Sequence, residues 1–223
     1  MRINRYIAQS TGMSRRAADR LIYTGQVTVN GLTASAGQDV SDADKISIDG
    51  KQIASSADQK FITIVMNKPV GYVCSRDGQG SKTVYDLLPE ELHILKPVGR
   101  LDKDSSGLLV MTNNGKLAHE LSHPSYQKRK VYNISLSHSL TPLHHQMICD
   151  YGIMLEDGVS KFSLDRISEG NDKDWRVTMT EGRNRQIRRT FSALDYSVKR
   201  LHRIKFGEYT LANLRNTVYT IVS

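Results

Sequence analysis

Residues 99–115 read GRLDKDSSGLLVMTNNG, a polar loop flanked by glycine that runs into the apolar stretch Leu108 to Met111. Four consecutive apolar residues behind a polar loop predict a buried strand. A loop attached to such a rigid element can hold charged side chains in a fixed position. We therefore expect this segment to carry functional residues.

Asp102 is the side chain of this loop with the clearest chemical use. It lies beside Arg100 and Lys103, whose positive charges favour the ionised carboxylate that a nucleophile or base requires. Asp104 is a rival in the same loop, and either aspartate could simply cap a turn or pair with a basic neighbour. The loop alone leaves these alternatives open.

Strand patterns occur on both sides of this loop and define the fold class. Residues 61–66 read as a buried strand, and apolar residues alternate with period two at 132–136 and again at 175–179. Helices are expected at 116–122 and from about Arg185 onward. Strands and helices follow one another without regular alternation, which predicts an α+β fold with a mixed, mainly antiparallel sheet and flanking helices.

The first 57 residues predict a separate small helix-hairpin module. One helix begins near Ile3, and a second is capped by Ser14 and ends at Gly25. Asn30-Gly31 between two short extended runs favours a type I′ hairpin turn. Residues 54–59 are small and polar and read as a linker, so we expect domains at 1–57 and 58–223.

Basic residues outnumber acidic ones across the chain. There are 31 Lys and Arg against 23 Asp and Glu, a formal net charge of +8 that suits a polyanionic partner such as RNA. The small module contributes five arginines to a possible phosphate-binding surface: Arg2, Arg5, Arg15, Arg16 and Arg20. A solvated helical face is the alternative interpretation of these five residues.

A second basic cluster opens the helix expected near Arg185. Four arginines fall within seven residues, and Arg188 lies nearest the apolar face, so it should point inward and needs an anion. That anion could be an RNA phosphate or a carboxylate such as Asp102. Arg183, Arg185 and Arg189 would then face phosphates, unless the helix is simply solvated.

Other classes of function find little support. Cys74 and Cys149 are too few and too far apart for a disulfide framework, and their number suits a reducing cytosol. No run is long enough for a signal peptide or a membrane span, so we expect a soluble cytoplasmic protein without membrane contact. We expect no metal site from the four histidines at positions 119, 123, 144 and 145, which lack a carboxylate partner at useful spacing.

Three motifs occur in a characteristic order: Gly-Arg-Leu-Asp at 99–102, Lys-Val-Tyr at 130–132 and Arg-Gln-Ile-Arg-Arg at 185–189. In that order they closely resemble the RsuA-type family of ribosomal RNA pseudouridine synthases. The amino-terminal module is similar to an RNA-binding domain of a small-subunit ribosomal protein, a likeness carried by residues 14–18 and 25–31. The resemblance covers nearly the whole chain.

The resemblance implies roles that the residues alone do not establish. Asp102 becomes the catalytic aspartate, Tyr132 packs against the target base, and Arg188 pairs with Asp102. Strand alternation by itself makes Tyr132 only an inward aromatic. Lys68, in the matching segment 67–72, would contact a phosphate or support a turn, and Arg100 would join the RNA-binding residues.

The family reaction cleaves the bond between ribose C1′ and uracil N1, turns the base and joins ribose to uracil C5. The family needs no cofactor or metal, and the implied partner is ribosomal RNA or an assembly intermediate, bound by a monomer. The motif at 185–189 resembles large-subunit enzymes, whereas residues 72–75 resemble the small-subunit enzyme, and we favour the large subunit. The main alternative is an inert RNA-binding or ribosome-assembly factor with the same fold. A hydrolase that pairs Asp102 with Asp104 is a weaker one.

Overall fold

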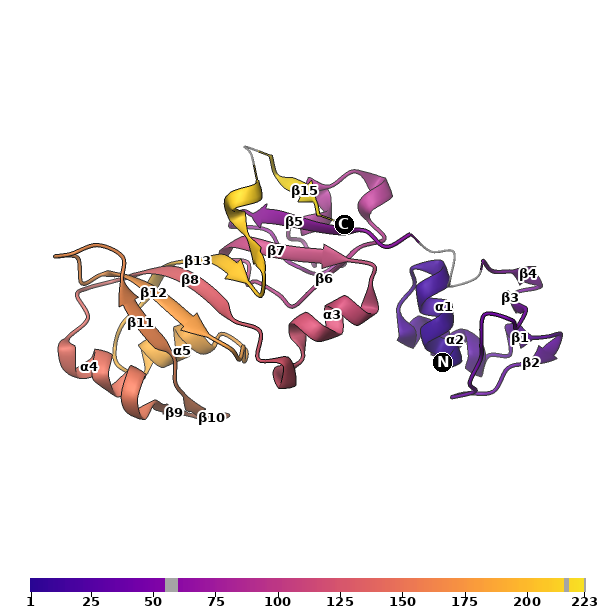
Figure 1. Cartoon of the computed structure of the whole chain (residues 1–223), viewed down its shortest axis with the longest axis horizontal. Helices are drawn as coiled ribbons and strands as arrows, with labels where there is room; N and C mark the ends of the chain where they lie inside the picture. Colours follow the sequence, from indigo (N-terminus) through magenta and orange to yellow (C-terminus); the bar gives the residue numbers. More distant parts are fainter. Residues whose placement is uncertain (55–59, 215–216, 223) are drawn as a thin grey trace. The chain divides into compact units, whose positions relative to one another are not determined.

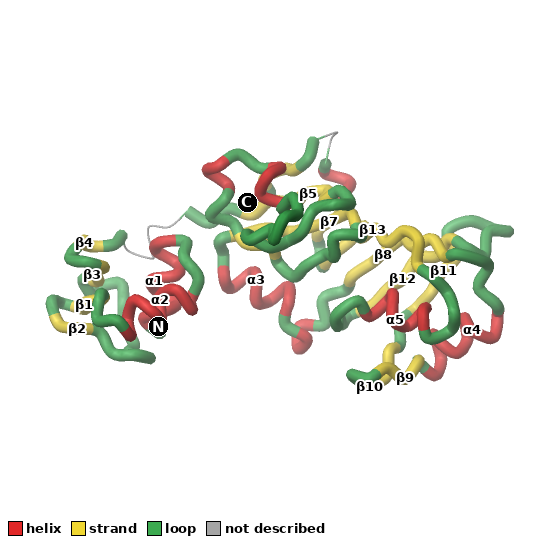
Figure 2. The backbone as a smooth tube through the Cα atoms, turned by 180° about the vertical axis from the view of Figure 1, so that it is seen from behind, coloured by secondary structure: helices red, strands yellow, loops and turns green. Residues whose placement is uncertain are grey.

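The computed structural model describes residues 1–54, 60–214 and 217–222 (Figures 1 and 2). The chain forms two compact units, one of Met1–Ile62 with Asn113–Gly115 and one of Thr63–Thr112 with Lys116–Ser223. The domain boundary predicted at 57/58 lies outside the described residues. None of the helices in the described ranges is long and apolar enough to cross a membrane.

The smaller unit contains the helices and hairpins that the sequence predicts. Its elements are α1 (Ile3–Thr11), α2 (Arg15–Tyr23), β1 (Val27–Val29), β2 (Leu32–Thr33), β3 (Ile46–Ile48) and β4 (Lys51–Gln52). The Ser14 side chain caps α2 by accepting a hydrogen bond from the Ala17 amide at 3.1 Å. Asn30 and Gly31 both have positive φ, 51° and 85°, which is the type I′ geometry expected between β1 and β2.

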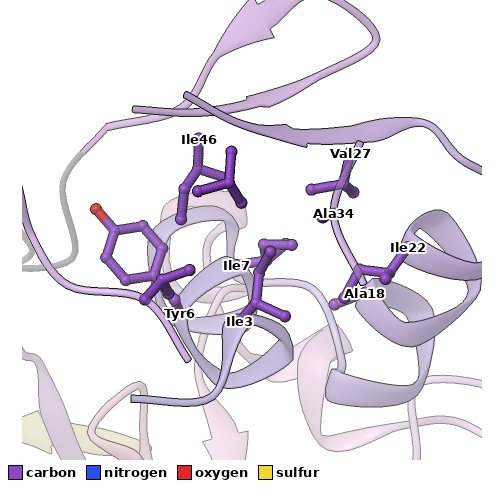
Figure 3. Close-up of a cluster of buried hydrophobic side chains, with 10 residues drawn as sticks. Ile3, Tyr6, Ile7, Ala18, Ile22, Val27, Ala34 and Ile46 are labelled. Atoms are coloured by element: carbon purple, nitrogen blue, oxygen red, sulfur yellow. The ribbon is translucent and has the colours of Figure 1, made fainter. Parts of the chain in front are cut away.

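One hydrophobic cluster holds this unit together (Figure 3). Ile3 and Ile7 from α1 are fully buried, and Ala18 from α2 and Val27 from β1 close over them. The helices therefore pack on one another and on the small sheet through a shared apolar face. Their arginines remain on the solvent side.

The larger unit is built on one extended sheet. Its main path runs β11-β12-β8-β13-β7-β5-β15, and every adjacent pair along it is antiparallel except β13 and β7. The strands of this path are β5 (Thr63–Lys68), β7 (Ser106–Thr112), β8 (Lys130–Leu136), β11 (Ser163–Arg166), β12 (Asp174–Met179), β13 (Val198–Phe206) and β15 (Tyr219–Ile221). The predicted α+β class with a mainly antiparallel sheet is confirmed.

Short strands and helices complete this unit. They are β6 (Lys96–Pro97), β9 (Ile153–Leu155), β10 (Gly158–Ser160), β14 (Tyr209–Thr210), α3 (Gly115–Ser122), α4 (Pro142–Gln146) and α5 (Gln186–Ser192). The helix α3 covers the centre of the sheet by burying Leu121 against Val65, Leu108 and Phe206. The expected helices at 116–122 and near Arg185 are both present.

The parallel pair β7 and β13 depends on a glycine. Gly107 lies opposite Arg203 with φ of +104°, and a Cβ there would lie 2.6 Å from the Arg203 amide nitrogen and closer still to its carbonyl oxygen. No residue with a side chain fits without moving one of the strands. The close approach places β13 beside the strand that follows the 99–105 loop.

Candidate active site

The 99–105 loop, between β6 and β7, is held from below by a buried lysine. Lys68 has no exposed surface, and its ammonium donates hydrogen bonds to the carbonyl oxygens of Pro69 (3.0 Å), Asp102 (3.1 Å) and Ser105 (2.7 Å). Burial lowers the pKa of Lys68, partly opposed by nearby negative groups that include Asp102. Lys68 therefore fixes the backbone of the loop and cannot reach a phosphate, which corrects the expected phosphate contact.

The carboxylates of this loop meet the arginines at the start of α5. Arg185 places one nitrogen 3.2 Å from Asp102 and forms two hydrogen bonds to Asp104, at 3.3 and 3.2 Å. The Asp102 side chain is 36% exposed, so it stays accessible while it faces a guanidinium. The Asp102 carboxylate therefore lies at the edge of a cavity, within reach of a ligand.

The ion pair expected between Arg188 and Asp102 is not formed. Arg188 points inward, as its position on the helix predicts, with 13% of its side chain exposed. Its guanidinium donates to the carbonyl oxygens of Val198 (2.6 Å) and Asp104 (3.0 Å) and lies 3.4 Å from the Asp104 carboxylate. Arg188 thus ties the loop to β13, and Arg185, which was expected to face phosphate, occupies the position beside Asp102.

Asp104 is held ionised by this arrangement. Partial burial favours the neutral acid, but the hydrogen bond from Arg185 and the charges of Arg188 and Arg185 outweigh it and hold the pKa of Asp104 below its ordinary value of 3.8. An Asp104 carboxylate that is held ionised offers no neutral acid to pair with Asp102. The arrangement therefore gives no support to a paired acid and base.

Tyr132 lies in the wall of the same cavity. It projects from β8 between Val177 of β12 and Arg203 of β13 and is 7% exposed. A cavity of about 330 Å³ opens between this part of the sheet, the 99–105 loop and the start of α5. Asp102, Tyr132 and Arg188 all line it, so the structure brings the three expected catalytic residues together.

The cavity wall also includes basic residues that we expected to meet RNA. Arg100 lines it, is exposed and has no ion-pair partner among the described residues. Arg183 and Arg185 line it as well, but both are engaged with protein groups. Of the expected RNA-binding residues in this unit, Arg100 is the one whose guanidinium is left available.

Arg183 and Arg189 are held by the turn between β9 and β10. The Asp157 carboxylate accepts from Arg183 at 2.9 Å and from Arg189 at 2.6 and 3.1 Å, and Arg183 also donates to the Gly158 carbonyl at 3.0 Å. The hydrogen bond from Arg189 and the charges of both arginines lower the pKa of Asp157. The expected phosphate contacts are thus replaced by internal ion pairs in this structure.

Two basic residues of the cavity were missed by the sequence analysis. Arg203 is 2% exposed and donates to the Leu108 carbonyl at 2.7 Å, but its second terminal nitrogen is buried without a hydrogen-bond partner. Lys130 donates to the carbonyls of Thr180 and Glu181 at 3.2 and 3.3 Å. Both lie on strands at positions that face the cavity. Period-two alternation along these strands could have identified them.

The five expected RNA-binding arginines of the first module lie in the other unit. Arg5, Arg16 and Arg20 are exposed and form no ion pair among the described residues. Arg15 donates to the Asn4 side chain at 3.4 Å. Arg2 donates to the Gly37 carbonyl and approaches Asp39, so it is partly engaged with its own unit.

Within the described residues, no group of three or more His, Cys, Asp or Glu is arranged to hold a metal ion. The two cysteines are free, and burial raises the pKa of the Cys74 thiol. The groups that the cavity offers for chemistry are therefore one accessible carboxylate, a tyrosine and several cations.

Comparison with known proteins places this cavity in context. Residues 62–193 match the family model of RNA pseudouridylate synthases. A solved structure described as a pseudouridylate synthase aligns over 100% of this chain and 96% of its own, with a TM-score of 0.70 and 26% sequence identity.

Curated relatives act, by name, on both ribosomal subunits. Ribosomal large subunit pseudouridine synthase B of Xanthomonas axonopodis pv. citri is 35% identical over 94% of this chain, and ribosomal small subunit pseudouridine synthase A of Pasteurella multocida is 32% identical over 95%. The chain spans 40% of the length of the Xanthomonas protein and 90% of that of the Pasteurella protein. An RNA pseudouridine synthase of Aquifex aeolicus is 36% identical over 96% of this chain and 87% of its own length.

Proposed function

The chain belongs to the family of RNA pseudouridylate synthases, and on that premise we propose that it isomerises a uridine of ribosomal RNA to pseudouridine with Asp102 as the catalytic carboxylate. The observation that carries this proposal is the shared cavity lined by Asp102, Tyr132 and Arg188. They come from a loop, a strand and a helix that are far apart in sequence.

The reaction conserves atoms. The C1′–N1 bond of uridine breaks, the detached base turns, and a C1′–C5 bond forms, while C5 loses a proton and N1 gains one. In this proposal the Asp102 carboxylate acts as the nucleophile or as the base, and its ion pair with Arg185 orients it. Tyr132 packs against the base and relays the C5 proton.

The remaining residues of the site position these groups. Lys68 fixes the loop backbone through three carbonyl oxygens, and Arg188 joins the loop to β13. A target uridine must leave its helix or loop, at a cost of about a few kcal/mol. Phosphate contacts from Arg100 and from the exposed arginines of the first unit offset this cost, which makes residues 1–57 an RNA-binding module in this proposal.

We favour large-subunit ribosomal RNA as the substrate of a cytoplasmic, monomeric enzyme. The relatives named for the large subunit are 34–37% identical to this chain, against 32% for the small-subunit relative from Pasteurella multocida. The near-equal length of the small-subunit relative makes it the alternative to test. A map of both ribosomal RNAs separates the two substrates.

The test maps pseudouridines in both ribosomal RNAs by carbodiimide modification and primer extension. Cells that lack the gene are compared with the same cells carrying the wild type, Asp102→Asn or the matched control Lys103→Gln. Lys103 is an exposed neighbour in the same loop, and its ammonium donates to the Ser81 hydroxyl at 3.0 Å instead of pairing with Asp102 as its position in the sequence suggested. We expect one position to lose its mark and to regain it with the wild type and with Lys103→Gln, but not with Asp102→Asn. Marks that all persist in the deletion strain would oppose the proposal and favour an inert RNA-binding factor.

A further inference from the structure

The sheet of the larger unit has a second hollow on its other face. Strand register shows this directly: Met179, Lys130 and Phe206 form one row across β12, β8 and β13, and all three line the cavity of the candidate active site. The adjacent row is Thr178, Val131, Lys205 and Thr210, which crosses β12, β8, β13 and β14. Side chains of adjacent rows point to opposite faces.

That second row lines a cavity of about 440 Å³, which we name the reverse groove. Its floor includes Val131 and Ile204, and its polar residues are Arg129, Arg176, Lys205, Thr178 and Thr210. None of these residues lines the first cavity. The groove is therefore a separate feature, although the same three strands build both sides.

The three cations of the groove find no partner among the residues that the structure describes. Arg129 and Arg176 are exposed and Lys205 is half-buried, and no side chain of the three forms an ion pair or hydrogen bond with another of the described residues. Asp165 lies opposite Arg176 on β11 but does not form an ion pair with it.

The four arginines just before and within α5 behave differently. Arg183, Arg185, Arg188 and Arg189 each form an ion pair with a carboxylate of the chain. Unpaired like charges around one hollow repel each other and are stabilised when an anion binds.

We propose that the reverse groove binds backbone phosphates of the RNA that is modified on the opposite face. This inference rests on the proposed function and adds a second contact to it. Three cations and two threonine hydroxyls suit phosphate oxygens, whereas the described residues of the groove include no aromatic ring on which a base could stack. RNA that extends beyond the target stem-loop is therefore held through its backbone, without regard to sequence.

The test compares a short stem-loop that contains the target uridine with a longer RNA that carries the same stem-loop and flanking duplex. The groove variant is Arg176→Gln with Lys205→Gln, and the matched control is Lys173→Gln with Lys199→Gln, two exposed lysines of the same unit outside the groove. Dissociation constants are measured against salt concentration for both RNAs. Conversion of the short stem-loop is followed separately and reports on the proposed function alone.

We expect the groove variant to bind the longer RNA more weakly than the wild type does. The slope of log Kd against log salt concentration should also become shallower by about 2, because each lost phosphate contact removes about 0.9 from the slope and two cations are removed. The control pair should keep the wild-type preference for the longer RNA, and the charge-retaining variant Arg176→Lys with Lys205→Arg should restore it.

An unchanged slope in the groove variant overturns the proposal. A second result also overturns it. If calorimetry shows that inorganic phosphate binds and that binding requires Arg176 and Lys205, while the salt slope for RNA stays at its wild-type value, the groove is a site for small anions and not for RNA. If the wild type fails to convert the stem-loop, the proposed function fails instead, and the binding comparison still decides on the groove.

Discussion

At the scale of single residues, the site depends on which arginine meets which carboxylate. Arg185 contacts both Asp102 and Asp104, while Arg188 binds the Asp104 carboxylate and two backbone carbonyl oxygens. One guanidinium therefore orients the Asp102 carboxylate, and a second holds the loop that carries it. The position of Arg188 on the helix predicted that it points inward. It could not predict how α5 packs against the 99–105 loop, and that packing decides which aspartate each arginine contacts.

Asp104 gives this arrangement a pH dependence. Its pKa is lower in the folded protein than the ordinary 3.8, so its ionisation stabilises the fold above that value, and the contribution is lost as the pH falls through the folded-state pKa. We expect Asp104→Asn to reduce the free energy of unfolding at neutral pH and to match the wild type at pH values well below 3.8. Urea titrations at both pH values measure this difference, and a gap that persists in acid would contradict the assignment.

At the scale of elements, the parallel pair β7 and β13 sets the geometry of the site. Gly107 allows the strands to approach, and the approach aligns the loop before β7 with Arg203 on β13. The sequence predicted β7 from its apolar run, but a strand pattern does not reveal its neighbour. The parallel partner of β7 lies about a hundred residues further along the chain, so local periodicity carries no signal for it.

Gly107→Ala tests this close approach. The new Cβ meets the Arg203 backbone and the residue keeps a positive φ, so we expect a loss of about 3 kcal/mol in the free energy of unfolding. Gly99→Ala is the matched control, because Gly99 also has a positive φ, +68°, but a Cβ there meets nothing within 4 Å. It should cost about 1 kcal/mol. Equal losses in urea unfolding would show that backbone strain alone, and not strand contact, makes Gly107 necessary.

Elements also explain what the sequence analysis misjudged. Ile64, Met66 and Lys68 share one face of β5, and all three are fully buried. Period-two spacing along this strand could have placed Lys68 on the buried face, although a buried lysine is rare enough that its charge argued for solvent. Asp157 was missed because it lies 26 residues before Arg183, on a hairpin whose packing against α5 is a tertiary contact.

At the scale of the whole molecule, the sequence predicted two parts and the fold class of the larger one. Caps, turn residues and apolar patterns identified α1, α2, the Asn30-Gly31 hairpin and strands β5, β7, β8 and β12, since those signals are local, whereas β11, β13 and β15 were not predicted. Strand order and the reverse groove follow from pairings between distant strands and could not be predicted from the sequence. The three motifs identified the family before any geometry was available.

The arginines of the first unit make a prediction at this scale. Arg16 and Arg20 lie one turn apart on α2, and both are exposed and unpaired among the described residues. We expect Arg16→Gln with Arg20→Gln to weaken RNA binding and to reduce its salt dependence by about 2 in the log-log slope. Lys45→Gln with Lys51→Gln removes the same charge from the same unit and should have a smaller effect. Filter binding across a salt series measures both pairs. Equal effects would show that only the net charge of the unit matters and that Arg16 and Arg20 form no specific RNA-binding surface.

The most direct measurement is tritium release from ribosomal RNA labelled at uridine C5, because formation of the C1′–C5 bond expels the hydrogen at that carbon. With purified protein, we predict tritium release by the wild type and by Lys103→Gln. In Asp102→Asn the rate of release should fall by about a hundredfold to ten-thousandfold, while RNA binding is retained. Release by Asp102→Asn at the wild-type rate, or no release by the wild type from either ribosomal RNA, would contradict the account.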